Sequence, residues 1–432
     1  MVCEANNQVE YIQMYDKEKW YIQKRKLRAF GNSLCFYVCR IFPIDNNLIS
    51  VCTFEGKGGF GCNPKYVVEE LHKRDSKYKF VWLVNKDVLN KEFPDYIRRV
   101  NNSSIWSRAY WLSRSKVWID NYRKPFDTRK RKNQYYLNTN HFTIGIKCTG
   151  LNRGSGFSEM ARLVNQNDSN MMDALVTDSD WCEKTCPKGM LFDGPYLRTG
   201  APRCDILYGK REIPRANFRK KHGLTADAKV VMYAPTFREG AKDGKRFVYS
   251  EEWTLDFSRL LKALEERFGG DWYICLRVHP QLATLFKDYK NPELQDRIID
   301  ESQADDMYEI LAAMDAYITD YSSAVFEAGF AKIPAFIYAD DIEKYAHDRG
   351  QLMWNIATDP KEHVTNNKTV LPYKNLGFPF SISTNNDEME KTVQGFDQNR
   401  YENELDGFYQ TIGQVFDGNA SKYLADELSS KI

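Results

Sequence analysis

Short apolar runs alternate with amphipathic segments along most of this chain. The first series begins at Leu48, where "LISVCTF" predicts a buried strand, "YVVEELHKR" an amphipathic helix and "FVWLV" a second strand. The segments "KVWIDN" and "YYLNTN" continue the series as strands. Strands that alternate with helices are typical of an α/β fold built on a parallel sheet.

A second series of the same kind begins after Pro202. The pattern predicts a helix in "FSRLLKALEERFG" and strands in "KVVMYAP", "WYICLRVHP", "RIIDE", "AYITDY" and "PAFIYA". Two such series predict two Rossmann-like domains that face each other across a cleft. We expect an N-terminal segment (1–46), two Rossmann-like domains (47–200 and 201–384), and C-terminal helices (385–432) that in part pack back on the first domain.

The N-terminal segment mixes basic with aromatic and aliphatic side chains, and the apolar run 34–44 follows it. The basic residues are Lys17, Lys19, Lys24, Arg25, Lys26 and Arg28, among Trp20, Tyr21, Ile22, Leu27 and Phe30. One interpretation is an interfacial helix that lies on anionic lipid. The other is a solvated helix that packs on its own domain. The polar start shows no signal peptide, and no apolar run has the length needed to cross a bilayer.

Composition narrows the class of protein further. The chain has 432 residues and a formal net charge of only +2, so no global field favours nucleic acid as a partner. Its ten cysteines are scattered without the spacing of a zinc or redox motif, which favours reduced thiols. We find no cluster with metal-ligand spacing, and the sequence demands no cofactor.

The stretch "ITDYSSAVFE" places polar residues between a predicted strand and a predicted helix. A strand that feeds a helix through a polar turn forms an anion site, because the first N–H groups of the helix are unpaired. Ser322 and Ser323 would add hydroxyl donors, with the helix cap at Tyr321 or Ser322. The alternative is that the two serines only cap a helix.

Two neighbouring strands of the second series also end in polar groups. "YAPTFRE" ends in Thr236, Arg238 and Glu239, and "LRVHPQ" ends in Arg277 and His279. The strand before Ser322 and Ser323 is the third, and it ends in Thr319 and Asp320. The carboxyl ends of parallel strands meet at one edge of a sheet. We therefore expect these groups to converge on a pyrophosphate.

The first series contributes "YYLNTNHFTIGIKCTG", with His141 at the end of a predicted strand. A neutral imidazole there could act as a general base, although a histidine held by a backbone hydrogen bond is the alternative. Thr143 and Lys147 follow on what we expect to be the acceptor side. The Gly-rich loop "EGKGGFGCNPK" matches neither the dinucleotide fingerprint nor the P-loop, and we expect it to line the acceptor side as well.

Several segments together resemble the CDP-glycerol glycerophosphotransferase family, which contains teichoic-acid primases, polymerases and capsule enzymes. In order, they are "FEGKGGFGCNPKYVVEEL", "VWIDNYRKP", "YYLNTNHFT", "GAPRCDIL", "VVMYAPTFRE", "LRVHPQ", "ITDYSSAVFEAGFAKIPAFIY" and "DRG". The resemblance implies a GT-B architecture. It also implies transfer of glycerol phosphate or ribitol phosphate from CDP-glycerol or CDP-ribitol to a lipid-linked or polymer acceptor. Peripheral attachment to the cytoplasmic face of a bacterial membrane, at an anionic surface, is a further implication.

The resemblance also implies roles for individual residues. His141 would be the base that takes the acceptor proton, and His279, the other expected catalytic residue, would bind the donor diphosphate with Ser322 and Ser323. Thr319 and Asp320 would shape the turn, while Thr236 and Arg238 would lie beside the nucleotide. The chain departs from the family pattern at Phe142, where a glycine is usual, and at Cys62, where an aspartate is usual.

Two rival functions stay open on the sequence alone. A glycosyltransferase of the same architecture would release a nucleoside diphosphate instead of CMP. A non-catalytic, membrane-bound scaffold would retain the fold without turnover. A divalent cation could assist either reaction by binding the diphosphate of the donor.

Overall fold

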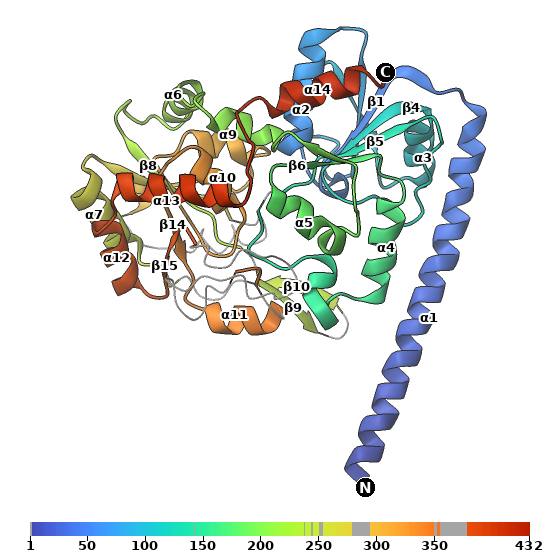
Figure 1. Ribbon diagram of the computed structural model, residues 1–432, viewed down its shortest axis with the longest axis horizontal. Coiled ribbons are helices and arrows are strands. Elements are labelled where there is room, and N and C mark those ends of the chain that lie inside the picture. The colour runs from blue at the N-terminus through green and yellow to red at the C-terminus, as the bar shows by residue number, and fades with distance from the viewer. Residues whose placement is uncertain are drawn as a thin grey trace.

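The computed structural model describes residues 2–142, 144–236, 238–242, 245–249, 254–278, 294–349, 352–354 and 378–432. Two parallel sheets with covering helices organise this part of the chain (Figure 1). The strands predicted from apolar runs are present, and most of these runs are buried inside a sheet. The exception is the predicted strand "RIIDE", which forms a half-buried strand at an edge of the second sheet. The predicted α/β class is confirmed.

The first sheet has seven parallel strands in the order β3-β2-β1-β4-β5-β6-β7. These are β1 Asp45–Cys52, β2 Lys79–Val84, β3 Ile97–Asn101, β4 Ser115–Asp120, β5 Tyr135–Asn138, β6 Ala174–Thr177 and β7 Tyr196–Arg198. Its helices are α2 Cys62–Arg74, α3 Ile105–Arg114, α4 Glu159–Ser169 and α5 Asp180–Gly189. The short 3-10 helix η4, Pro202–Leu207, leads from this sheet to the second one.

The second sheet has six parallel strands in the order β12-β11-β8-β13-β14-β15. These are β8 Lys229–Tyr233, β11 Trp272–Leu276, β12 Ile298–Asp300, β13 Ala316–Thr319, β14 Ala335–Tyr338 and β15 Ser381–Ser383. The helices around it are α6 Glu212–Lys221, α7 Phe257–Phe268, α9 Met307–Ala312, α10 Ala324–Phe330, α11 Ile342–Arg349, α12 Asn386–Gln394 and α13 Gln398–Thr411.

Both sheets reverse their strand order next to their first strand. The reversal lies between β1 and β4 in the first sheet, and between β8 and β13 in the second. In open parallel sheets, ligands bind at the carboxyl ends of the strands beside such a switch point. The loops that follow these four strands are therefore the place to look for a functional site.

The N-terminal helix α1, Val2–Val38, projects from the body of the molecule as one long rod (Figure 1). The last turns of α1 pack on the part of the molecule that holds the first sheet, next to α3. There, Phe36 is fully buried and Asn32 donates a hydrogen bond to Asp127 at 2.8 Å. Several large apolar side chains of α1 are exposed: Trp20, Tyr21, Leu27, Phe30, Leu34 and Tyr37.

The C-terminal helices divide between the two sheets. Phe408 of α13 stacks on Phe326 of α10, with ring centroids 5.6 Å apart. The last helix, α14 Ala420–Ser429, instead lies beside α2 (Figure 1). Its Leu424 and Leu428 are fully buried in the apolar cluster of the first sheet. The chain therefore ends on the sheet with which its strands began.

Some elements differ from the sequence-based expectation. Strand β3 was not predicted because its pattern, "IRRVN", carries two exposed arginines at an edge of the sheet. Strand β7 has only three residues. Arg238, expected at the end of a strand, instead begins β9 Arg238–Lys242, which pairs antiparallel with β10 Lys245–Tyr249.

Candidate active site

The strand ends β8 and β13 are joined through Asp320. Its carboxylate accepts hydrogen bonds from the backbone N–H of Thr236 at 2.8 Å and from the Thr236 hydroxyl at 3.1 Å. Thr319 donates its hydroxyl to the carbonyl of Ala234 at 2.7 Å. Both Thr319 and Asp320 are buried. These residues fix the turn after β13, as expected of groups that shape a binding loop.

Arg238 is held by two carboxylates. Its guanidinium pairs with Asp320 at 2.8 Å and makes two bonds to Asp341, at 2.7 and 2.9 Å. It also lies over the rings of Tyr321 and Tyr345, which stack on each other with centroids 3.8 Å apart. Because both carboxylates compensate its charge, Arg238 orders the turn. Its expected place beside a nucleotide stays a prediction.

The two serines of this turn cap α10 only in part as the sequence predicted. The N-cap is Ser323 rather than Tyr321 or Ser322, and it has helical backbone angles, with no capping hydrogen bond from its side chain. The hydroxyl of Ser322 accepts the N–H of Ala324 at 3.3 Å. Both side chains are half-buried. Their role as phosphate ligands stays a prediction.

Two of the expected site residues, Thr143 and His279, lie outside the described residues. Arg277, next to His279 in sequence, donates to the carbonyls of Glu301 and Ala304, at 2.6 and 2.5 Å. It therefore fixes the loop after β12. Lys147 forms an isolated antiparallel bridge with Leu352, and its acceptor-side role stays a prediction.

His141 lies in the loop after β5, and its tautomer follows from one contact. Its Nδ1 is 2.9 Å from the carbonyl oxygen of Asn121, which can only accept. Nδ1 therefore carries the proton, and Nε2 keeps its lone pair. Burial, together with the nearby cations Arg203, Lys147 and Arg123, lowers the pKa of His141 to about 4. The imidazole is thus neutral and presents a base.

Aromatic rings surround this imidazole. Phe54, Tyr122 and Phe142 lie with ring centroids 5.6, 5.2 and 5.3 Å from it. Phe142 stands where a glycine is usual in the family pattern, and its edge-to-face contact with His141 narrows the space beside the ring. The departure therefore changes the wall of the site while leaving the histidine in place.

Asn63, from the segment "CNPK", holds the loop that carries His141. Its side-chain amide donates to the carbonyls of Thr139 and Asn140, both at 2.9 Å. Its oxygen accepts the backbone N–H of Arg203 at 3.1 Å. Asn140 has a φ of 55°, a left-handed conformation that asparagine tolerates better than most residues. The Gly-rich segment thus helps to position the loop that carries the histidine.

Arg203 links the histidine loop to α10. Its buried guanidinium donates to the carbonyl of His141 at 2.6 Å and pairs with Glu327 at 2.6 Å. Glu327 is fully buried and also accepts a hydrogen bond from the hydroxyl of Tyr308. A third contact joins Arg203 to the sulfur of Cys62 at 3.1 Å. One side chain therefore connects loops that belong to both sheets.

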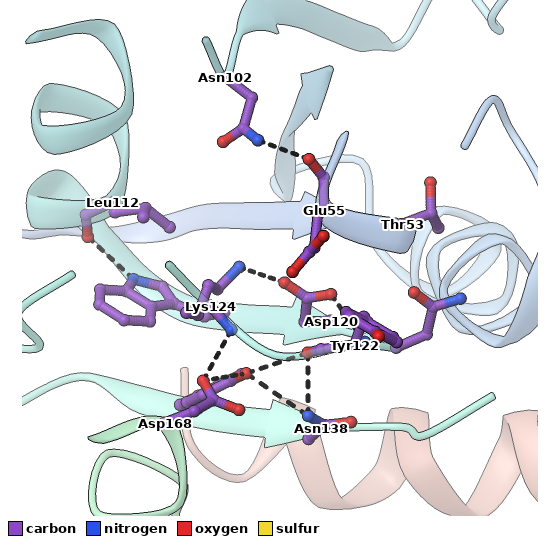
Figure 2. A network of polar contacts seen from close by, with 12 residues as sticks. Thr53, Glu55, Asn102, Leu112, Asp120, Tyr122, Lys124, Asn138 and Asp168 are labelled. Atoms are coloured by element: carbon purple, nitrogen blue, oxygen red, sulfur yellow. Dashed lines mark hydrogen bonds and ion pairs between the residues drawn. The ribbon is translucent and has the colours of Figure 1, made fainter. Parts of the chain in front are cut away.

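A second buried network supports the loop after β4 (Figure 2). Lys124 pairs with Asp120 at 2.6 Å, and its backbone N–H donates to Asp168 at 2.9 Å. The hydroxyl of Tyr136 donates to the same Asp168 at 3.1 Å, and burial raises the pKa of Asp168 to about 7. Because Asn121 lies within this loop, the network fixes the carbonyl that orients His141.

The Gly-rich loop contacts the second sheet's loop after β12. A Cβ on Gly61 would lie 2.7 Å from the backbone carbonyl oxygen of Asp305, so a larger residue there would force the two loops apart. Lys65 forms a buried ion pair with Asp306 at 2.8 Å. A cavity of about 730 Å³ opens beside this contact, and none of the predicted site residues lines it.

Sequence analysis missed most of the supporting residues. Arg203, Asp120 and Lys124 stand in quoted segments, but no role was assigned to them. A charged residue inside an otherwise apolar motif could have identified them, since charged residues are buried only when they are paired.

In the described part of the chain, no three His, Cys, Asp or Glu side chains cluster as metal ligands. Nor does any helix there have the length and apolarity to span a membrane.

The two sheets and their strand order define a GT-B-like protein. The model structure superposes on the wall teichoic acid polymerase TagF with a TM-score of 0.74 at 25% identity, covering 95% of this chain and 97% of that one. The family model described as CDP-Glycerol:Poly(glycerophosphate) glycerophosphotransferase matches residues 34–371. The chain belongs to this family, as its motifs predicted.

Two relatives show the extent of the similarity. The chain is 28% identical over 408 residues to the teichoic acid poly(glycerol phosphate) polymerase of Staphylococcus epidermidis, covering 90% of this chain and 52% of that one. It thus spans about half of that relative's length. It is 27% identical over 405 residues to the teichoic acid glycerol-phosphate transferase of Staphylococcus aureus, covering 89% and 93% of the two chains.

The tautomer of His141 can be tested directly. We expect ¹⁵N-edited NMR to show a protonated Nδ1 and a bare Nε2 from pH 8 down to about pH 5, because the pKa is lowered to about 4. His141→Gln assigns the resonance by its disappearance. A midpoint near the ordinary value, about 6.5, would contradict the described environment.

The link between Arg203 and Glu327 predicts a large stability cost. Glu327→Gln leaves a buried guanidinium without its carboxylate and should destabilise the protein by about 3 kcal/mol in urea denaturation. The matched control is Glu402→Gln, which breaks a part-exposed pair with Lys332 and should cost less than about 1 kcal/mol. Equal costs for the two variants would show that the buried pair does not hold the loops together.

Proposed function

We propose that this chain transfers glycerol phosphate or ribitol phosphate from a CDP-activated donor to a hydroxyl of a lipid-linked or polymer acceptor in teichoic acid synthesis, releasing CMP. Family membership supports the reaction type. The names of the relatives support the pathway and include both polyols. One is a teichoic acid poly(ribitol-phosphate) polymerase of Bacillus spizizenii, 25% identical over 331 residues.

The observation that carries this proposal is the state of His141. A neutral imidazole, with Nδ1–H bound to Asn121 and Nε2 bare, is the form that a general base requires. The backbone carbonyl of His141 accepts a hydrogen bond from Arg203, and Arg203 pairs with Glu327. Glu327 lies on α10, one helical turn beyond Ser323. This link supports a base that acts beside the turn after β13.

In the proposed mechanism, the acceptor hydroxyl attacks the phosphorus that bears the polyol. Nε2 of His141 takes the hydroxyl proton as the new O–P bond forms, and the bond to the bridging oxygen breaks so that CMP leaves in line. Phosphoryl transfer depends mainly on positioning and on stabilised charge. The proposed donor ligands are Ser322, Ser323 and His279, with Thr319, Asp320, Thr236 and Arg238 around them. The proposal includes no resident cofactor, and a divalent cation would act on the donor's diphosphate.

Helix α1 supports a peripheral attachment to an anionic membrane surface. Trp20, Leu27 and Phe30 are 67%, 74% and 64% exposed. Lys24 lies 5.1 Å from the Trp20 ring centroid, and Arg25 lies 5.9 Å from that of Tyr21. Exposed aromatic rings with cations beside them are suited to the headgroup region of a bilayer. The cytoplasmic face of a bacterial membrane is the location that we propose.

The reaction can be tested by identifying the released nucleotide. We expect CMP from CDP-glycerol or CDP-ribitol when a lipid-linked acceptor is present. His141→Ala should lower kcat by at least about 100-fold, because general base catalysis is lost, and should leave donor affinity unchanged. A nucleoside diphosphate released from a nucleotide sugar would instead make the protein a glycosyltransferase. Loss of CDP-glycerol binding in His141→Ala would refute the assignment of the base.

Membrane attachment has its own test. Replacing Lys24, Arg25, Lys26 and Arg28 with Gln should weaken co-sedimentation with anionic phosphatidylglycerol vesicles, by about 1 kcal/mol for each charge near the surface. The remaining binding should depend less on salt. Binding equal to that of the unchanged protein would rule out α1 as the attachment site.

A further inference from the structure

The proposed base, His141, lies in a row with two other side chains, Tyr122 and Arg123. The ring of Tyr122 lies 5.2 Å from the His141 ring, and the guanidinium carbon of Arg123 lies 5.1 Å from the Tyr122 ring. Arg123 is also one of the cations that lower the pKa of His141. The width of one aromatic ring therefore separates a positive charge from the proposed catalytic imidazole.

Arg123 is less compensated than the other arginines of the site. Arg203 is buried and the Arg238 side chain is 14% exposed, and both bind carboxylates at 2.6–2.9 Å. The Arg123 side chain is 31% exposed, and its carboxylate contact, with Glu55, is 3.8 Å long. Asn165 accepts one hydrogen bond from it at 3.0 Å. Burial raises the pKa of Glu55 although Arg123 opposes this, which is consistent with a weak pair.

The backbone of the turn that carries Glu55 is strained. Phe54, Glu55 and Gly56 have φ values of 48°, 60° and 86°, all in the left-handed region. For Phe and Glu this conformation is costly, and strain of this kind concentrates at functional sites. The turn is held by a bond from Asn102 to the Glu55 carbonyl at 2.9 Å. It places Phe54 against His141 and Glu55 against Arg123.

We propose that Arg123 binds the phosphodiester of the acceptor's terminal unit while that unit's free hydroxyl meets Nε2 of His141. In a polyol phosphate chain, a three-carbon or five-carbon backbone separates the terminal hydroxyl from the nearest phosphate. That separation suits the row Arg123, Tyr122 and His141. A part-exposed guanidinium can make two parallel bonds to a phosphate.

Glu55 opposes the binding of a phosphodiester to Arg123. Its carboxylate lies near Arg123 without a hydrogen bond, so an incoming phosphodiester must compete with it. The acceptor thus exchanges a weak, part-exposed ion pair for a stronger one. This selects an acceptor that already carries a phosphodiester over a bare polyol. The inference rests on the proposed function, since it assigns the acceptor side of the same reaction.

The test uses two soluble acceptor probes and CDP-glycerol as the donor. One probe is glycerol joined to an octyl chain through a phosphodiester, and the other is the uncharged octyl ether of glycerol. The variants are Arg123→Gln, Arg123→Lys and Glu55→Gln. The exposed Arg400→Gln on α13 serves as the control for a change of one charge. Acceptor KM, donor KM and kcat are measured for each.

We expect the unchanged protein and the control to favour the phosphodiester probe by roughly tenfold in kcat/KM. Arg123→Gln should raise KM for this probe by a similar factor, with no effect on the ether probe or on donor KM. Arg123→Lys should keep most of the preference because it keeps the charge. Glu55→Gln should lower KM for the phosphodiester probe. If the Arg123–Glu55 pair had only a structural role, Arg123→Gln and Glu55→Gln would both lower kcat/KM.

The failures of the two proposals can be told apart. CMP release without any preference between the probes would overturn the acceptor site and leave the transferase function intact. A rise in donor KM in Arg123→Gln, with acceptor KM unchanged, would assign Arg123 to the donor and overturn the inference. No CMP from either probe or from a lipid-linked acceptor would overturn both.

Discussion

The buried ion pair between Arg203 and Glu327 is the interaction on which the rest of the site depends. Its two residues lie 124 positions apart in the chain. Glu327 belongs to the helix that follows Ser322 and Ser323, and Arg203 holds the loop that carries His141. The same guanidinium holds the carbonyl of His141 and contacts the sulfur of Cys62. A planar side chain with five donors can make such separate contacts in a fixed geometry, which lysine cannot.

Buried charge is a costly way to hold a protein together, and this protein uses it at several points. Lys124 with Asp120, Lys65 with Asp306, and Arg203 with Glu327 are all nearly excluded from solvent. Apolar residues of the same size would often be at least as stabilising. Charged groups instead specify one arrangement of the loops, because a shifted loop would leave a charge unpaired. In the proposed mechanism, His141 must meet the acceptor hydroxyl while that hydroxyl meets the phosphorus, and such a reaction depends on precise positions more than on stability.

The sequence predicted the fold well and the site only in part. Strands such as β2 and β13 are buried on both faces, so their apolar runs identify them without further information. His141 could be found because it follows such a strand. Its partners could not, since Asn121 acts through a backbone carbonyl and Arg203 approaches from η4, 62 positions further along the chain. The N-cap position of α10 is Ser323, one residue beyond the predicted Ser322, although the Ser322 hydroxyl accepts the N–H of the first residue of the helix.

The length of α1 has a consequence for how the molecule can be held. The helix has 37 residues, which at 1.5 Å per residue gives a rod of about 55 Å. Its last turns are packed firmly on the first sheet's side, through Phe36 and the bond from Asn32. A rigid rod joined to a body transmits orientation as well as position. Any surface that binds along α1 would therefore determine which side of both sheets faces it.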